Sequence, residues 1–231
     1  MIKKRRVQTE QISVIIVAGG SGSRMQSDRP KQFLELCGKP ILMHTISAFT
    51  DFCEGVLPIV VIPPSQRDNW LKLCDIHGFF QPHEIVEGGE TRFQSVKNGL
   101  MILPDNGLVA IHDGVRPLVS KLTITECFKE ASIYGCAIPT ISVPDSVREV
   151  NGLNNRTLDR SKLCLIQTPQ VFDIKNLKKA YQQPYSPSFT DDASVYESAG
   201  YAIRLTKGNE ENIKITTPND LIVAEALMRI Y

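Results

Sequence analysis

The sequence ISVIIVAGGSGSRM, residues 12–25, joins an apolar, largely β-branched run to a glycine-rich turn that is followed by an arginine. The run at 12–18 has the composition of a strand that is buried on both faces of a sheet. Glycines directly behind such a strand allow backbone amides to approach a phosphate group closely. The stretch therefore predicts an α/β sheet with an anion site at the carboxyl end of this strand.

The remainder of the chain alternates between strand-like and helix-like segments. The strand-like runs lie at 56–63, 83–89, 108–114, 136–143 and 201–208. Helical spacing of apolar residues, or helix boundary signals, mark 41–49, 70–77, 91–103, 121–134, 190–200 and 217–231. This alternation predicts a single Rossmann-like α/β domain over residues 1–231, with a mainly parallel sheet and helices on both of its faces.

Residues 144–166 interrupt the alternation. They read PDSVREVNGLNNRTLDRSKLCLI, which is polar and turn-rich, with short strand-like alternation as in SVREV. An excursion of this length without its own core is usually functional or an interaction element. We predict a β-hairpin arm that projects from the domain and packs against a partner subunit, and a plain surface loop is the alternative.

The composition argues against two classes of partner. The formal net charge is +1, so no overall field favours nucleic acid or a membrane surface. The apolar runs are too short to span a bilayer, and the basic N-terminal residues precede no apolar signal-peptide core. The six cysteines are scattered without a CxxC pair, which favours reduced thiols. We expect a soluble cytoplasmic protein that binds neither nucleic acid nor membrane.

The glycine turn matches neither of two common phosphate-binding loops. Met25 stands where the dinucleotide-binding pattern GxGxxG has its last glycine, and the P-loop pattern GxxxxGK[ST] is absent. What remains is a turn whose amides face an anion, followed by two cations, Arg24 and Lys31. We interpret the loop as a place where a phosphate is held and attacked. A solvated loop with unrelated basic residues is the alternative.

A series of short motifs extends this interpretation over the chain. AGGSGSRM at 18–25 and PKQF at 30–33 resemble the signature loop of nucleotidyltransferases that join a nucleoside triphosphate to a phosphorylated metabolite. They are followed by GGETRFQSV (88–96), HDGVRP (112–117), LDRSKL (158–163), QTPQ (167–170), TDDAS (190–194) and ENIKITTPNDL (211–221). With these motifs, nearly the whole chain resembles the 2-C-methyl-D-erythritol 4-phosphate cytidylyltransferases of the non-mevalonate isoprenoid pathway.

The resemblance implies a fold of the nucleotide-diphospho-sugar transferase type and a reaction of CTP with 2-C-methyl-D-erythritol 4-phosphate, a small polyol phosphate. The implied products are 4-diphosphocytidyl-2-C-methyl-D-erythritol and pyrophosphate, and the implied cofactor is Mg²⁺ or another divalent cation. A homodimer whose arm reaches the neighbouring active site is implied as well. The residues agree with this chemistry, because a substrate phosphate with a second pKa of roughly 6 is largely dianionic and needs no general base. The sequence correspondingly shows no Ser-His-Asp or paired-acid motif.

The resemblance also assigns roles to individual residues. Arg24 and Lys31 match the catalytic cations that stabilise the transition state, a task suited to fixed positive charges. Two roles are open for Asp113. It lies beside the triphosphate and a metal ion, which is itself held mainly by phosphates, or it orients Lys214. The predicted nucleotide-binding residues are Ala18, Gly19, Gly20, Gly89, Glu90, Ser95, Asp113 and Lys214, and the predicted sugar-phosphate-binding residues are Arg116, Ser146, Arg160, Thr168 and Thr190.

Three other functions fit parts of the sequence. Ribitol 5-phosphate cytidylyltransferases share most of the motifs, but TLDRSKL and TDDASVYE resemble the erythritol enzymes. A hexose-phosphate nucleotidyltransferase predicts longer C-terminal extensions, which are missing. A non-catalytic nucleotide-binding protein on the same fold predicts loss of Arg24, Lys31, Asp113 or Lys214, and all four are present. We therefore favour the methylerythritol phosphate cytidylyltransferases.

Overall fold

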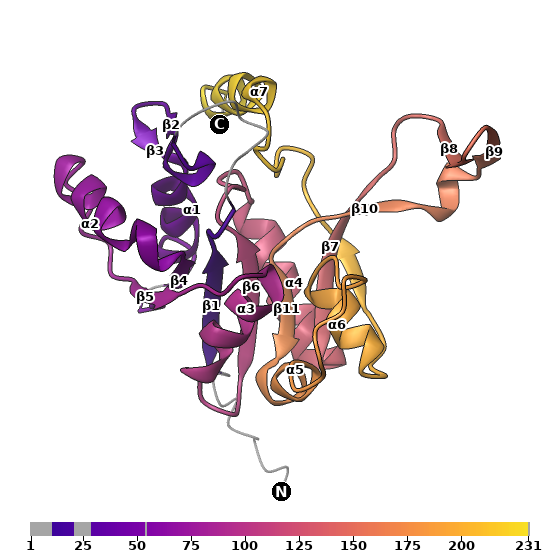
Figure 1. Ribbon diagram of the computed structural model, residues 1–231, viewed down its shortest axis with the longest axis horizontal. Helices are drawn as coiled ribbons and strands as arrows, with labels where there is room; N and C mark the ends of the chain where they lie inside the picture. The colour runs from indigo at the N-terminus through magenta and orange to yellow at the C-terminus, as the bar shows by residue number, and fades with distance from the viewer. Residues whose placement is uncertain (1–10, 21–28, 54, 231) are drawn as a thin grey trace, which may run out of the picture.

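Strand β1 (Ile12–Val17) lies in the interior of the central sheet. The computed structural model describes residues 11–20, 29–53 and 55–230. Strand β1 pairs in parallel with β4 (Ile59–Ile62) on one side and with β6 (Leu108–Asp113) on the other, and β5 (Glu84–Glu87) extends the sheet beyond β4 (Figure 1). Because these strands are parallel, their carboxyl ends meet at one edge of the sheet.

The other half of the sheet contains antiparallel strands. Strand β11 (Gln170–Asp173) lies antiparallel between β6 and β7 (Cys136–Ser142), and β10 (Cys164–Ile166) pairs antiparallel with the end of β7. Strand β12 (Leu205–Lys207) pairs with β7 in parallel. The predicted mainly parallel Rossmann-like sheet is confirmed. Strand β11 and the helix after it, α5 (Ile174–Ala180), were not predicted, because a run of four residues carries little periodicity.

Helices cover both faces of the sheet, as predicted. One face carries α1 (Ile41–Thr50), α2 (Arg67–Ile76) and α4 (Lys121–Tyr134), and the other carries α3 (Arg92–Met101), α5 and α6 (Asp192–Ser198). Successive side chains of a strand point to opposite faces, so Val14 and Ile16 pack with the first set and Ile15 with the second. Burial on both faces explains why β1 and β6 appear in the sequence as unbroken apolar runs.

A smaller apolar cluster lies beneath the last helix, α7 (Pro218–Met228). It contains Leu36 of the hairpin formed by β2 (Glu35–Leu36) and β3 (Lys39–Pro40), and it also contains the fully buried Ile215. Helix α7 is drawn in yellow at the top of Figure 1. Neither α7 nor any other helix within the described residues is long and apolar enough to cross a membrane.

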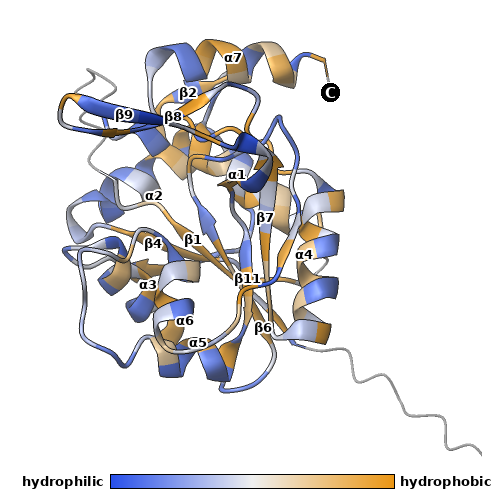
Figure 2. Cartoon of the chain, turned by 90° about the vertical axis from the view of Figure 1, so that its right-hand side faces the viewer, coloured by the Kyte–Doolittle hydropathy of each residue, from blue (hydrophilic) through white to orange (hydrophobic). Residues whose placement is uncertain are grey.

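The predicted hairpin arm is present. Strands β8 (Val147–Asn151) and β9 (Asn154–Leu158) pair with each other and form a separate two-stranded sheet. The arm projects far beyond the central sheet in Figure 1, and Figure 2 shows that it is mostly hydrophilic. It leaves the sheet after β7 and returns through β10, which pairs with β7, so its base is anchored while both of its strands are largely exposed.

Candidate active site

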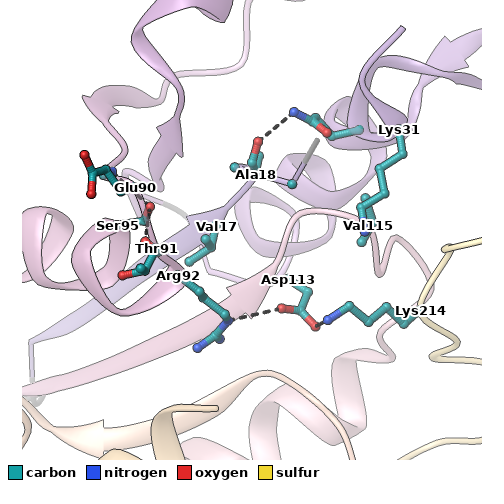
Figure 3. Close-up of a pocket in the computed structure, with 14 residues that line it drawn as sticks. Val17, Ala18, Lys31, Glu90, Thr91, Arg92, Ser95, Asp113, Val115 and Lys214 are labelled. Atoms are coloured by element: carbon teal, nitrogen blue, oxygen red, sulfur yellow. Dashed lines mark hydrogen bonds and ion pairs between the residues drawn. The ribbon is translucent and has the colours of Figure 1, made fainter. Parts of the chain in front are cut away.

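A cavity of about 190 Å³ lies at the sheet edge where the carboxyl ends of β1, β5 and β6 meet. Ligands of parallel α/β sheets bind at this edge. Figure 3 shows the cavity between the turn after β1, the start of α3 and the end of β6. Every predicted nucleotide-binding residue lines it, together with Lys31. Arg24, the other predicted catalytic cation, lies outside the described residues.

The turn after β1 is held from two sides. The amide of Ala18 donates to the carbonyl of Val61 in β4 at 2.8 Å, and the buried Gln32 donates its Nε2–H to the carbonyl of Ala18 at 2.7 Å. Gln32 follows Lys31 in a short 3-10 helix, Lys31–Phe33. A Cβ atom added to Gly20 would lie 3.1 Å from Cε of Lys31. The structure therefore places the Lys31 side chain directly over the glycine turn.

The turn after β5 depends on the side chain of Ser95. Its hydroxyl accepts a hydrogen bond from the amide of Gly89 at 3.1 Å and donates to the carbonyl of Thr91 at 2.9 Å. A Cβ atom on Gly89 would lie 2.1 Å from Cγ of Gln94, so glycine is required there. Ser95 was predicted to contact the nucleotide, and the structure shows in addition that it fixes the backbone of the turn.

Asp113 is surrounded by three cations. Its Oδ2 lies 3.0 Å from Nζ of Lys214 and 3.2 Å from Nε of Arg116, and its Oδ1 lies 3.8 Å from Nε of Arg92. Figure 3 shows the carboxylate between Arg92 and Lys214. Burial opposes ionisation of Asp113, but the cations outweigh it, Arg92 most of all, and they hold the pKa of this carboxyl well below its usual range. The carboxylate is therefore ionised and orients the three cations around it.

His112 is fully buried next to this cluster. Its Nε2–H donates to the carbonyl of Arg116 at 2.9 Å, and its Nδ1 accepts from the hydroxyl of Thr168 at 3.0 Å. That hydroxyl in turn accepts from the amide of Asp113 at 3.1 Å. Burial lowers the pKa of His112 to about 4, so the ring is neutral. The histidine thus fixes the end of β6 against the segment between β10 and β11.

Buried amides hold the segment that carries Lys214. The Nε2 of Gln167 donates to the carbonyl of Asn209 at 2.9 Å, and the Nδ2 of Asn212 donates to the carbonyl of Thr168 at 2.7 Å. Ile215 donates its amide to the carbonyl of Val115 at 3.0 Å. Lys214 is therefore fixed on both sides along the chain, and its ammonium group is placed at the end of β6.

A second cavity of about 260 Å³ adjoins the first, and both are lined by Arg92, Asp113 and Lys214. Its wall also contains the predicted sugar-phosphate-binding residues Arg116, Thr168 and Thr190. The two cavities meet at the cation cluster, so a group bound in one lies next to a group bound in the other. This arrangement suits the joining of two phosphorylated molecules.

Two predicted substrate residues are not brought to these cavities. Ser146 and Arg160 lie in the exposed arm and line neither cavity of their own chain. The guanidinium of Arg160 donates instead to the carbonyl of Pro144 at the base of the arm. Their predicted role in substrate binding can be fulfilled only if the arm reaches the site of another subunit.

The acidic residues at the cavities do not form a metal cage. Within the described residues, no group of three or more His, Cys, Asp or Glu side chains is placed to hold a metal ion. Glu90 and Asp113 are the carboxylates that line the first cavity. Mg²⁺ in nucleotide sites is often held by one or two carboxylates together with substrate phosphates. The residues present therefore fit an ion that arrives largely with the nucleotide.

Arg92 and its partner Asp192 were not predicted from the sequence as site residues. Arg92 is the first residue of α3, where a positive charge is unfavourable because the helix dipole is positive at that end. An arginine at the start of a helix was therefore the one sign in the sequence that this residue has a specific acidic partner. Asp192 lies 100 residues further along the chain, so spacing could not identify it.

Known proteins resemble the chain over almost its full length. Residues 12–230 match the model of the family described as 2-C-methyl-D-erythritol 4-phosphate cytidylyltransferase. The enzyme of that name from Bacteroides fragilis is 52% identical over 216 residues, which cover 94% of this chain and 99% of the relative. The solved structure of the 4-diphosphocytidyl-2C-methyl-D-erythritol synthase of Anaerococcus prevotii is similar with a TM-score of 0.80 at 28% identity, covering 95% of this chain and 96% of that one. The solved structure of the 2-C-methyl-D-erythritol 4-phosphate cytidylyltransferase of Thermus thermophilus has a TM-score of 0.75 at 31% identity. The match covers 95% of this chain and 99% of that one.

Proposed function

The chain belongs to the 2-C-methyl-D-erythritol 4-phosphate cytidylyltransferase family, and from that premise we propose that the two adjoining cavities are where it transfers CMP from CTP to 2-C-methyl-D-erythritol 4-phosphate. It is a cytidylyltransferase of isoprenoid precursor biosynthesis. The observation that carries the assignment of the site is the group of three cations around Asp113, at the point where the cavities meet.

The reaction brings two anions together, so it requires positive charge more than a general base. A phosphate oxygen of methylerythritol phosphate attacks the α-phosphorus of CTP and forms a new P–O bond. The bond from that phosphorus to the oxygen that bridges to the β-phosphorus breaks, and this oxygen leaves with the electron pair on pyrophosphate. His112 lines neither cavity, and both of its ring nitrogens have partners, so it does not serve as the base.

Two lysines are placed to carry the electrostatic part of this reaction. Lys31 lies over the glycine turn, where the amides of Gly19 and Gly20 line the cavity for the triphosphate. Lys214 is held by Asp113 at the junction of the cavities, where we expect the transferring phosphorus to lie. Fixed charges of this kind cost no reorganisation during the reaction, which is why they stabilise a transition state strongly. The predicted role of Arg24 as a second transition-state cation remains part of the proposal.

We include Mg²⁺, or another divalent cation, as the cofactor that CTP brings. When bound, it would neutralise charge on the triphosphate and on departing pyrophosphate. We assign Asp113 to contact it, since this ionised carboxylate lines both cavities. Removal of divalent ions with a chelator should therefore abolish turnover, and added Mg²⁺ should restore it.

We further propose a cytoplasmic homodimer in which the partner's arm completes each active site. Two observations support this assembly: the arm projects beyond the central sheet, and Ser146 and Arg160, which lie on it, line neither cavity of their own chain. An arginine fork suits the phosphate of the second substrate. None of the six cysteines forms a disulfide bond, which is consistent with a reducing compartment.

A pyrophosphate-release assay with varied substrates tests the proposed function. With CTP and Mg²⁺ present, methylerythritol phosphate should give fast release, whereas ribitol 5-phosphate should give little. UTP, ATP and GTP should be poor replacements for CTP. Faster release with ribitol 5-phosphate would move the assignment to the ribitol enzymes, and binding of CTP without any release would favour a non-catalytic nucleotide-binding protein.

A further inference from the structure

Arg92 forms a two-pronged ion pair with Asp192 next to the cation cluster. Its Nη1 lies 2.9 Å from Oδ1 of Asp192 and its Nη2 lies 2.6 Å from Oδ2. Asp192 is completely buried, and its Oδ1 also accepts a hydrogen bond of 2.6 Å from the hydroxyl of Tyr181. Both terminal nitrogens of the guanidinium are thereby engaged by one carboxylate. The pair joins the start of α3 to the start of α6 beside the second cavity, which Arg92 and Asp191 line.

The third nitrogen of the same guanidinium faces the active site. Its Nε lies 3.8 Å from Oδ1 of Asp113, the oxygen opposite to the one that holds Lys214. Among the cations around it, Arg92 contributes most to keeping Asp113 ionised. Arg92 therefore belongs to two ion pairs at once, with one face of its guanidinium turned to Asp192 and one edge turned to Asp113.

We propose that Arg92, locked by Asp192, is a positioning residue that orients Asp113 and through it the Lys214 ammonium at the reacting phosphate. The inference rests on the proposed function, because it concerns the same reaction. Asp192 acts as the buried anchor: a planar guanidinium bound at two nitrogens cannot rotate, so its Nε is fixed in direction. Without this anchor, Asp113 would keep Arg116 and Lys214 but lose the contact that restrains its second oxygen.

The Arg92–Asp192 pair could instead serve only to stabilise the fold. A double substitution distinguishes this structural role from the positioning role. Arg92→Gln alone leaves the Asp192 carboxylate buried without its cation, so it should destabilise the fold for that reason alone. Arg92→Gln combined with Asp192→Asn removes both charges and allows an amide–amide contact instead. If the pair served only stability, the double variant would regain both stability and turnover.

The experiment measures unfolding and steady-state kinetics of the wild type, the two single variants and the double variant. We expect the double variant to recover most of the stability lost in Arg92→Gln, while its kcat stays at least about tenfold below wild type and its KM for CTP changes by less than about threefold. Recovery of kcat together with stability would overturn the inference. The turnover of the wild type tests the proposed function itself, whereas the ratio of the variant kcat to the wild-type kcat tests the role of Arg92. A failure of the proposed function is therefore distinguishable from a failure of the inference about Arg92.

A conservative variant tests the inference if the double variant does not fold. Arg92→Lys retains one positive charge for Asp192, but a single ammonium cannot also present the fixed Nε edge to Asp113. We expect near-normal stability with a kcat reduced about tenfold, and a wild-type kcat would contradict the positioning role. The matched control is the surface ion pair of Arg204 and Glu130, 2.9 Å apart. Replacement of both Arg204 and Glu130 by glutamine should leave kcat unchanged.

Discussion

The ammonium group of Lys214 lies 3.0 Å from Oδ2 of Asp113, although the two residues come from segments at opposite sides of the arm in the sequence. This ion pair joins the segment before α7 to the carboxyl end of β6, where the two cavities meet. It gives the site a lysine whose position does not depend on the substrate.

Replacement of Lys214 by methionine should lower kcat by about 100-fold or more, because a fixed charge at the reacting phosphate is lost. The KM for CTP should rise much less. Steady-state pyrophosphate release measures both constants. Lys207→Met, an exposed lysine on β12, is the matched control and should leave both unchanged. A Lys214→Met enzyme with kcat within twofold of wild type would contradict the role of this ion pair.

The ionised Asp113 should stabilise the fold in a pH-dependent manner. Since its pKa is depressed in the folded state, its contribution is fully present above about pH 4, the value of an unfolded aspartate, and is lost as the pH falls further. The difference in unfolding free energy between wild type and Asp113→Asn should therefore be largest near neutral pH and shrink below about pH 4. Urea denaturation between pH 3 and pH 7 measures it, with Asp68→Asn as the control, since Asp68 is an exposed aspartate in α2. A difference that grew as the pH fell would be incompatible with the cation cluster.

Protonation of His112 should destabilise the folded state. Its pKa is lowered to about 4 by burial, whereas an unfolded histidine titrates near 6.5. Between these values the unfolded state binds more protons, so stability falls as the pH falls, by about 3 kcal/mol in total. In His112→Gln, the loss of stability between pH 7 and pH 4 should be smaller by that amount. If the unfolding free energy depended on pH equally in the wild type and in His112→Gln, the imidazole would not be held neutral.

The hydroxyl of Ser95 should matter for binding more than for turnover. Ser95→Ala removes the acceptor for the Gly89 amide, which costs about 1 kcal/mol and corresponds to a rise in the KM for CTP of about fivefold. The kcat should remain within about twofold. Ser132→Ala removes an exposed hydroxyl that bonds a backbone carbonyl in α4 and serves as the control. An unchanged KM for CTP would show that the turn does not need this hydroxyl.

Active sites shared between subunits predict complementation between two inactive variants. In a mixed dimer of Lys31→Ala and Arg160→Ala subunits, one site combines an intact Lys31 with the partner's intact Arg160. Mixed dimers isolated with two affinity tags should therefore recover about half of the wild-type kcat, because one of two equivalent sites is complete. Mixed dimers as inactive as the parent variants would show that the arm serves its own subunit.

The parts of the fold that were predictable are those with local signals. Buried parallel strands such as β1 and β6 require continuous apolar runs, and the arm interrupts the pattern visibly. Strand β11 was not predictable, because it is only four residues long and begins at the last residue of the QTPQ motif. Its antiparallel direction depends on how the chain returns from the arm, which is a tertiary property.

The candidate site was predictable to the extent that its residues belong to recognisable motifs. Ala18 and Gly89 follow strands and Asp113 ends one, so the topology brings them to one edge of the sheet. The second function of Ser95, as a support for Gly89, was not visible because it depends on the depth at which α3 packs. The role of Arg92 depends on Asp192, and a pair separated by 100 residues leaves no trace in spacing.

The proposed reaction moves the α-phosphorus of CTP onto a polyol phosphate, so following that atom tests the proposed function most directly. CTP labelled on the α-phosphorus is incubated with the enzyme, Mg²⁺ and methylerythritol phosphate, and the products are separated. We predict that the label appears in 4-diphosphocytidyl-2-C-methyl-D-erythritol, with unlabelled pyrophosphate released in equal amount. Label that remained in CTP, or that appeared as free CMP without the joined product, would contradict it.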